Sequence, residues 1–375
     1  MMRVSLLAFL IVTAAMQPAT AGEFYREELR IPMAAAGPGG LEAVLIRPAG
    51  NGRYPLALIS HGTSRDADAR RNMTPYGFYR HAIEFARRGF AALVVMRRGF
   101  GGSGGEYADR NSCCDLGTYL RGARTNAADL RVAIAAMKNR ADVDTRGMIA
   151  IGASTGGLAT VALASDPPPG LAAAINFAGG LHRVTLTGKD ARNERDETSL
   201  VSAFRTFGKT SRIPMLWVYA ENDSFFRPDL AHRLFDAFTA AGGRAKLIDA
   251  PAFGTDGHFL FSNAGRSIWL PMVDDFLRAQ NLGARDLLAA PAPASLAPPP
   301  RLSEKGRAGF EEYLAAAPHK AFAVSPSGAY GYFSGMRSAA EALSAALTGC
   351  AKHVQDCAPY AIDDQLSGKA DGGPL

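Results

Sequence analysis

The sequence predicts an α/β fold in which helices flank a mostly parallel sheet. Short continuous apolar runs alternate with helical segments over most of the 375 residues, and this alternation is typical of βαβ units. Runs such as PLALIS at Pro55–Ser60 have the composition of strands that are buried on both faces. The hydrophobic content of 47% and the charged content of 20% fit a globular protein with a large core.

The order of the elements follows from these apolar runs and from the Gly, Pro and polar residues that interrupt them. An antiparallel pair is expected first, with buried strands after it: Glu27–Met33, Leu41–Arg47, Pro55–Ser60, Ala91–Met96, Met148–Gly152, Leu171–Phe177, Pro214–Ala220 and Ala245–Ala250. The expected helices are Tyr79–Arg88, Asp115–Asn139, Leu158–Ser165, a short one near Glu197–Phe207, Pro228–Ala241 and Ala264–Gln280. Together they form a predicted α/β domain over residues 22–281.

Residues 1–21 have the features of a secretory signal peptide. The positive residue Arg3 precedes the apolar run Val4–Met16, and Ala19-Thr20-Ala21 is an A-x-A cleavage site. The apolar run is too short to favour a transmembrane helix. We therefore expect export to the periplasm or the cell exterior, with no stable membrane span.

The composition changes after the predicted α/β domain. Residues 282–301 form an Ala/Pro-rich linker, residues 302–367 form a small α+β module, and residues 368–375 form a tail. In the module, helices are expected near Ser303–Ala316 and Ser338–Cys350. Strand-like segments are expected at KAFAVSP and CAPYAID.

Charge and cysteine content limit the possible functions. The formal charge is +6, but basic residues are scattered among acidic ones, so nothing indicates nucleic-acid binding.

Export makes disulfides plausible, and Cys350–Cys357 is the favoured pair because it closes a short loop. Cys113 and Cys114 are adjacent, and the strain of a vicinal bridge favours free thiols. No set of His and acidic residues gathers around either pair, so we predict neither a metal site nor a cofactor.

The stretch MIAIGASTGG, Met148–Gly157, carries the clearest chemical signal. An apolar strand ends at Gly152, Ser154 follows in a tight turn, and a helix begins after it, which is the layout of a nucleophile elbow. Gly152 and Gly156 leave room for a serine at strained backbone angles and let strand and helix approach closely. The backbone N–H of Thr155 then faces a developing oxyanion.

The G-x-S-x-G pattern occurs a second time, at Gly101–Gly105. That copy follows the strand Ala91–Met96 but continues into EYADRNSCC, which has no helical start. For Ser103 a glycine-rich loop is therefore the favoured interpretation. For Ser154 the alternative is a βα turn without chemistry.

A serine nucleophile needs a carboxylate and a histidine, which follow it in that order in such sheets. Asp223 comes directly after the strand Pro214–Ala220, and His258 follows the next strand, so we predict Ser154, Asp223 and His258 as the catalytic set. Thr63, after the strand Pro55–Ser60, is the predicted second backbone donor to the oxyanion, together with Thr155.

Other residues near these positions have competing interpretations. Glu221 is a rival for the acid, and Asp256 is more often a turn residue. Asp223 itself is alternatively a helix N-cap, and His258 a turn-capping histidine. His61 is interpreted as a packed residue that shapes the turn before Thr63.

Five motifs in this order resemble dienelactone hydrolase-type α/β hydrolases: SHGTS, RRGFGGSGG, GASTGG, AENDSFF and FGTDGHFLF. The resemblance covers roughly Glu27–Gln280 and implies the α/β-hydrolase fold. The enzymes that give the family its name use a cysteine nucleophile, whereas this elbow carries Ser154, which favours ordinary ester hydrolysis. The module from Leu302 resembles a small cysteine-containing domain of exported bacterial proteins, and no mechanism follows from it.

These residues predict a secreted or periplasmic serine hydrolase that cleaves carboxylic esters of small molecules through an acyl-enzyme. One alternative is a serine peptidase of the prolyl-oligopeptidase type, which shares the elbow but usually carries a propeller domain. The other is a non-catalytic binding protein on a hydrolase scaffold. A binding partner for the C-terminal module is left open.

Overall fold

A computed structural model describes residues 24–64, 66–109, 115–181, 194–284 and 286–367. The predicted signal peptide, the tail, and Cys113 and Cys114 lie outside the described residues, so the predictions for them stay untested. In the part of the chain that the structure describes, no helix has both the length and the apolar character needed to cross a bilayer.

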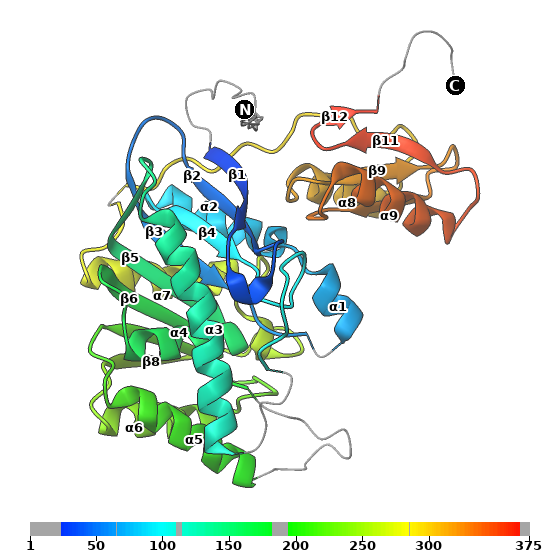
Figure 1. Cartoon of the computed structure of the whole chain (residues 1–375). Coiled ribbons are helices and arrows are strands. Elements are labelled where there is room, and N and C mark those ends of the chain that lie inside the picture. The colour runs from blue at the N-terminus through cyan, green and yellow to red at the C-terminus, as the bar shows by residue number, and fades with distance from the viewer. Residues whose placement is uncertain (1–23, 65, 110–114, 182–193, 285, 368–375) are drawn as a thin grey trace, which may run out of the picture.

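An eight-stranded sheet forms the first part of the chain (Figure 1), with the strand order β1-β2-β4-β3-β5-β6-β7-β8. The strands are β1 Phe24–Ile31, β2 Leu41–Pro48, β3 Tyr54–Ser60, β4 Ala91–Val95, β5 Val143–Ala153, β6 Leu171–Phe177, β7 Met215–Ala220 and β8 Ala245–Ala250. β2 pairs antiparallel with both β1 and β4, and the pairs from β4 to β8 are parallel. The predicted mostly parallel sheet is therefore confirmed.

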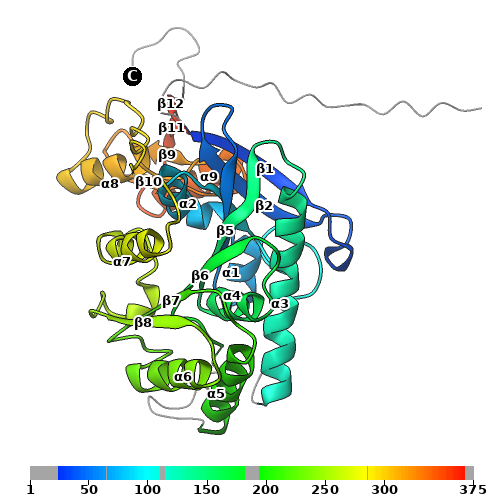
Figure 2. The ribbon, with the colours of Figure 1, turned by 90° about the vertical axis from the view of Figure 1, so that its left-hand side faces the viewer.

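Helices cover both faces of this sheet (Figure 2). α2 Tyr79–Arg87 and α7 Arg266–Ala279 pack on one face, and α3 Leu116–Met137, α4 Thr155–Ser165, α5 Glu194–Gly208 and α6 Pro228–Ala240 pack on the other. Along β3, Leu56 and Leu58 belong to one core and Ala57 and Ile59 to the other. Successive side chains of a strand point to opposite faces, so a strand covered on both faces must be apolar throughout.

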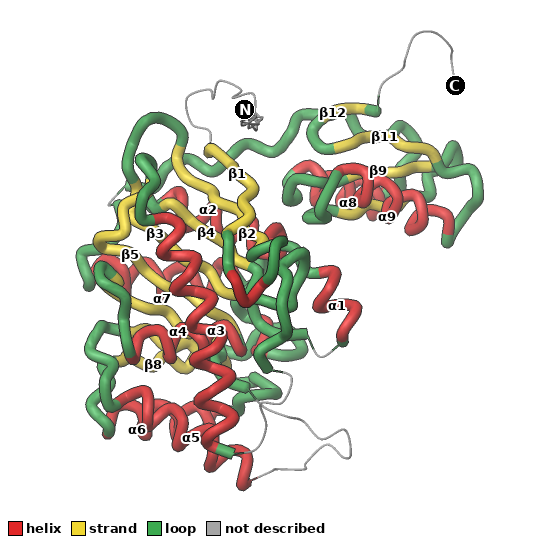
Figure 3. Tube along the Cα trace, viewed as in Figure 1, coloured by secondary structure: helices red, strands yellow, loops and turns green. Residues whose placement is uncertain are grey.

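Some short elements of the α/β domain were not predicted from the sequence. They are α1 Ala67–Asn72, labelled in Figure 3, and the 3-10 turns η1 Ala34–Ala36, η2 Pro75–Phe78 and η3 Gly257–Phe259. The sequence of α1, ADARRN, has no buried residue and therefore no apolar periodicity. Its start is fixed instead by the Asp66 carboxylate, which accepts from the N–H of Ala69 at 2.6 Å.

The C-terminal module has its own antiparallel sheet, in the order β10-β9-β11-β12. Its elements are α8 Glu304–Leu314, β9 Ala321–Val324, β10 Tyr330–Phe333, α9 Ala339–Ala351, β11 Ala358–Ile362 and β12 Gln365–Leu366. Phe322 packs with α8, whereas Ala321 and Ala323 pack with α9, so the two helices cover opposite faces. The predicted disulfide Cys350–Cys357 is present and joins the end of α9 to the start of β11.

The module contacts the α/β domain at β1 and at the segment 71–80. His319 Nε2 lies 2.7 Å from the carboxylate of Glu28 in β1, and the Thr74 hydroxyl donates to the carbonyl of Gly335. The Arg337 guanidinium donates to the carbonyl of Met73 at 3.3 Å. These polar contacts hold the module against β1 and against the residues that follow α1.

His81, in α2, makes the stability of the fold depend on pH. It is buried beside Phe261 and stacks on Trp269 at a ring distance of 5.5 Å. Burial disfavours the charged imidazolium and lowers the pKa of His81 from 6.5 to about 4. The unfolded chain therefore binds a proton here below about pH 6.5, while the native protein binds one only near pH 4.

We expect acid to lower the free energy of unfolding through His81, because the unfolded state binds more protons in this range. Between pH 7 and pH 4 the loss from this group is roughly 3 kcal/mol. In His81→Leu this part is absent. Between pH 7 and pH 4 the free energy of unfolding of the wild type should therefore fall by roughly 3 kcal/mol more than that of the variant. Urea titrations of both proteins at pH 7, 5.5 and 4 measure it, and parallel pH curves would contradict the prediction.

Candidate active site

Ser154 lies in the turn between β5 and α4 with φ 53° and ψ −123°, a strained backbone conformation. Its N–H donates to the carbonyl of Phe177 at 3.0 Å, which ties the turn to β6. A Cβ on Gly152 would lie 2.1 Å from the carbonyl oxygen of Gly156, and one on Gly156 would lie 2.4 Å from that of His61. Only glycine fits at either position, as the sequence analysis expected.

Asp223 and His258 meet at the carboxyl ends of β7 and β8. His258 Nδ1 lies 3.2 Å from Asp223 Oδ2, and both side chains are buried. The other carboxylate oxygen accepts from the N–H groups of Phe225 and Phe226, each at 2.8 Å. Because an ionised carboxylate only accepts hydrogen bonds, this geometry holds the proton on Nδ1 and leaves Nε2 as the basic nitrogen.

The rival acids have other places in the structure. Glu221 is exposed to solvent. Asp256 caps the turn η3, where its carboxylate accepts from the N–H groups of His258 at 2.9 Å and Ser224 at 3.0 Å. Asp256 therefore shapes the backbone that carries His258 and does not contact the imidazole nitrogens in the way Asp223 does.

Ser154 and His258 lie at the same edge of the sheet, but no hydrogen bond joins their side chains among the described residues. The carbonyl of Ser154 accepts from Gly180 N–H at 3.1 Å. A Cβ on Gly180 would meet the ring of Phe226, which lies 5.7 Å from the His258 ring. Serine–histidine bonds are often long in unliganded enzymes and shorten only when substrate binds. The structure thus joins the predicted acid and base directly, and Gly180 and Phe226 lie between them and the predicted nucleophile.

Thr63 and Thr155 flank Ser154 with backbone donors that are not used elsewhere. Within the described ranges, neither N–H has a hydrogen-bond acceptor. The loop that carries Thr63 contacts the predicted nucleophile, since a Cβ on Gly62 would lie 3.1 Å from the Cβ of Ser154. Two free N–H groups beside a serine are what a developing oxyanion requires.

The two threonine hydroxyls are hydrogen-bonded to each other at 2.6 Å. Thr155 Oγ1 also accepts from the guanidinium of Arg97 at 3.0 Å. Arg97 was missed by the sequence analysis, although its position was a usable signal. It directly follows the apolar strand Ala91–Met96, at the edge where the ends of parallel strands form sites.

His61 is a packed residue, as the sequence analysis expected. It is fully buried, and its ring lies 4.5 Å from that of Phe100. Burial and the neighbouring Arg97 charge lower the pKa of His61 well below 6.5. Its Nε2 accepts from the backbone N–H of Arg97 at 3.1 Å, so neutral His61 fixes the strand end before Thr63.

Ser103, in the second G-x-S-x-G copy, is also structural. Its hydroxyl accepts from the N–H of Glu42 at 2.8 Å and donates to the carbonyl of Met96 at 2.7 Å. These two hydrogen bonds of the hydroxyl join β2 to the end of β4. The loop interpretation of this copy agrees with that geometry.

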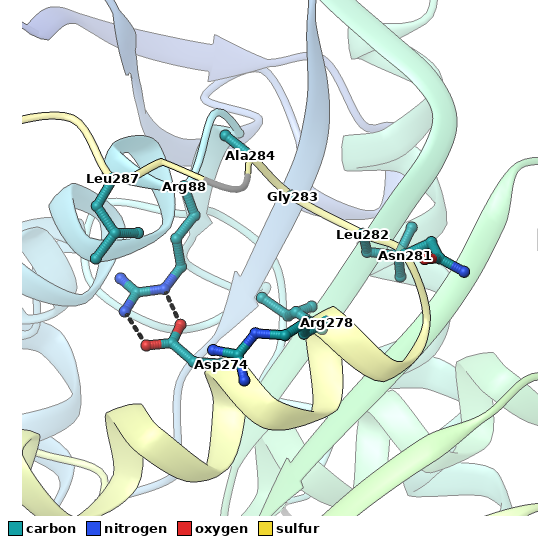
Figure 4. Close-up of a pocket in the computed structure, with 9 residues that line it drawn as sticks. Arg88, Asp274, Arg278, Asn281, Leu282, Gly283, Ala284 and Leu287 are labelled. Carbon is teal, nitrogen blue, oxygen red and sulfur yellow. Dashed lines mark hydrogen bonds and ion pairs between the residues drawn. The ribbon is translucent and has the colours of Figure 1, made fainter.

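A half-open cavity of about 640 Å³ lies elsewhere, at the C-terminal end of α7 (Figure 4). Its wall includes Arg88, which donates to both carboxylate oxygens of Asp274 at 2.6 and 2.9 Å. These charges already satisfy each other, and none of the predicted catalytic residues lines this cavity. Among the described residues there is also no cluster of three or more His, Cys, Asp or Glu side chains arranged to hold a metal ion.

Comparison with known proteins gives matches to the α/β domain. The family model described as X-Pro dipeptidyl-peptidase (S15 family) matches residues 39–188, which include Thr63 and Ser154 and end before Asp223. No curated protein sequence matches the chain.

Solved structures also match a large share of the chain. The esterase Pf2001 of Pyrococcus furiosus is 16% identical over 68% of this chain and 90% of its own, with a TM-score of 0.44. A putative dienelactone hydrolase from Klebsiella pneumoniae is 17% identical over 68% of this chain and 99% of its own, with a TM-score of 0.44. The acylaminoacyl peptidase of Pyrococcus horikoshii is 15% identical over 72% of this chain and 42% of its own, with a TM-score of 0.47.

The strand order, the antiparallel β2 and the helices on both faces define the architecture of the first domain. It has the α/β-hydrolase fold. In this fold the carboxyl edge of the sheet carries the chemistry, and the residues described above lie at that edge.

Proposed function

We propose that this α/β-hydrolase domain is a serine hydrolase that cleaves carboxylic esters of small molecules. The observation that carries the proposal is the buried pair Asp223–His258 beside a serine whose backbone is strained at φ 53°. An orienting carboxylate, a histidine base and a serine nucleophile are the parts that acyl transfer requires.

In the proposed mechanism His258 Nε2 takes the proton of Ser154 as Oγ attacks the ester carbonyl. The N–H groups of Thr63 and Thr155 stabilise the oxyanion of the tetrahedral intermediate. His258 then gives the proton to the departing alcohol, and an acyl-enzyme remains on Ser154. Water, deprotonated by His258, attacks the acyl group, and the free acid leaves. Asp223 holds the imidazole tautomer and stabilises its charged form.

We also propose that the protein works outside the cytoplasm. The support is the predicted signal peptide at residues 1–21 and the disulfide Cys350–Cys357 in the module, since disulfides persist in oxidising compartments. An exported hydrolase of this kind meets small esters in the periplasm or outside the cell.

A second candidate function is a serine peptidase. It is favoured by the match of residues 39–188 to the X-Pro dipeptidyl-peptidase model. A dipeptidyl-peptidase binds the free amino end of its substrate, so it needs an acidic subsite in addition to the residues that esters require. The same serine, acid and base would serve both reactions.

One experiment separates these functions. One sample of the protein from residue 22 onward is labelled with a fluorophosphonate probe. A separate, untreated sample is assayed with p-nitrophenyl esters of increasing chain length and with Ala-Pro-p-nitroanilide. We expect the probe to label Ser154, the esters to be hydrolysed and the anilide to be cleaved far more slowly. Faster turnover of the anilide than of the esters would show that the peptidase function, and not the esterase function, is correct. Folded protein that neither reacts with the probe nor hydrolyses an ester would support a non-catalytic protein.

A further inference from the structure

Arg97 is a fully buried arginine directly behind the proposed oxyanion hole. Its guanidinium donates to three neutral oxygens: Ser60 Oγ at 2.7 Å, the carbonyl of His61 at 2.6 Å and Thr155 Oγ1 at 3.0 Å. Its Nε has no hydrogen-bond partner among the described residues. Burying a charge without a direct carboxylate partner is expensive, so the fold retains Arg97 at a cost.

The contacts of Arg97 connect the two segments that carry the proposed oxyanion donors. Thr63 lies two residues after His61, whose carbonyl Arg97 binds and whose Nε2 accepts from the Arg97 backbone N–H. Thr155 is the first residue of α4 and is bound through its hydroxyl. A single side chain thus fixes the loop after β3 relative to the start of α4.

The threonine hydroxyls complete this connection with a defined direction. Arginine can only donate, so Thr155 Oγ1 accepts from Arg97. Thr63 Oγ1 lies 3.4 Å from the Asp109 carboxylate, which also accepts from Asn126 at 2.8 Å. Because a carboxylate accepts, Thr63 donates to Asp109, and Thr155 therefore donates to Thr63 across 2.6 Å.

We propose that Arg97, acting through the hydroxyl of Thr155, is a positioning residue that sets the spacing of the Thr63 and Thr155 N–H groups and stabilises the anionic tetrahedral intermediate. The inference rests on the proposed serine hydrolase function. The hydrogen-bonded chain Arg97–Thr155–Thr63–Asp109 keeps both N–H groups in place before substrate arrives, which is the preorganisation that makes oxyanion stabilisation effective. The positive charge behind the hole favours the same intermediate.

The test uses the hydroxyl of Thr155, because its removal changes little volume. Thr155→Val removes the hydrogen bonds to Arg97 and Thr63, and Thr155→Ser keeps them. Thr160→Val is the matched control, since it removes another buried hydroxyl of α4, one that donates only to the carbonyl of Gly156. Each protein is assayed with the p-nitrophenyl ester that wild type hydrolyses fastest.

We expect Thr155→Val to lower kcat by roughly 10- to 100-fold with little change in KM, because the lost stabilisation exists only in the transition state. The kcat of Thr155→Ser should lie within a few-fold of wild type, and the kcat of Thr160→Val should lie within about the same range. A general structural defect would instead affect Thr155→Val and Thr160→Val alike.

A second readout isolates the oxyanion. A trifluoromethyl ketone forms a tetrahedral adduct with the serine, whereas the corresponding secondary alcohol binds without forming one. Thr155→Val should raise the inhibition constant of the ketone by about the factor by which kcat falls. The inhibition constant of the alcohol should stay unchanged. Equal weakening of both inhibitors, an unchanged kcat, or no rescue by Thr155→Ser would overturn the inference.

Arg97→Met tests the origin of the effect. If Arg97 acts through Thr155, the double variant Arg97→Met/Thr155→Val should be little slower than Arg97→Met alone, and fully additive losses would contradict this. Should Arg97→Met fail to fold, the Thr155 variants carry the test by themselves.

If the fluorophosphonate probe does not label wild type at Ser154, the proposed function and this inference are overturned together. A labelled wild type with an unaffected Thr155→Val overturns the inference alone.

Discussion

Replacing Ser154 by alanine should lower the rate of ester hydrolysis by ~10⁴-fold or more. The substitution removes the only atom that can form the acyl-enzyme, while the backbone donors of Thr63 and Thr155 stay in place. The residual activity then comes from direct attack of water on the bound ester, which substrate binding and the oxyanion donors still accelerate. Initial rates with a p-nitrophenyl ester, normalised to folded protein, measure the loss. The same variant should no longer react with the fluorophosphonate probe.

Ser103→Ala is the matched control, because Ser103 lies in the same G-x-S-x-G pattern. Its hydroxyl joins Glu42 N–H to the Met96 carbonyl, and its removal leaves the partly buried N–H of Glu42 without an acceptor. We expect a loss of about 1–2 kcal/mol in the free energy of unfolding, with the rate per folded molecule within a few-fold of wild type. A Ser154→Ala protein that keeps normal activity, or a Ser103→Ala protein that loses it while folded, would show that the wrong serine has been assigned.

Asp223→Asn should lower kcat by roughly 10³- to 10⁴-fold with KM nearly unchanged. The amide has nearly the same shape, so the N–H groups of Phe225 and Phe226 can still be satisfied by its oxygen. The group that faces His258 Nδ1 is then an NH₂ donor, which favours the tautomer with the proton on Nε2. Nε2 in that tautomer cannot accept the proton of Ser154. Steady-state kinetics of the purified variant provide the measurement.

The rival carboxylates supply the controls. Glu221→Gln changes an exposed side chain and should leave the rate unchanged. Asp256→Asn keeps an oxygen that can accept from the N–H groups of Ser224 and His258, so the cap of η3 is retained and we expect a loss of rate of about a few-fold at most. If Asp256→Asn were as damaging as Asp223→Asn while the protein stayed folded, the acid would have to be reassigned.

Much of the α/β domain could be predicted from the sequence because its signals are local. Strands buried on both faces must be apolar along their whole length, so runs such as Leu171–Phe177 were located to the residue. The elbow was recognisable because strand, glycines, serine and helix lie within ten or so consecutive positions. The order serine, acid, histidine then restricted the acid and the base to the ends of two later strands, where Asp223 and His258 are found hydrogen-bonded.

What the sequence left open depends on contacts between distant segments. The sequence favoured Asp223 over Asp256 by position alone, and the hydrogen bonds of the folded protein show that Asp223 faces the imidazole whereas Asp256 caps a turn. Arg97 looked like one basic residue among many, because its three acceptors come from β3, the loop after it and α4. The sequence alone determined the strands of the α/β domain, the elbow and the order of the predicted catalytic residues, since spacing along the chain encodes them. Only the tertiary structure decided which polar groups are buried together, because burial and hydrogen bonding are properties of the packed sheet edge.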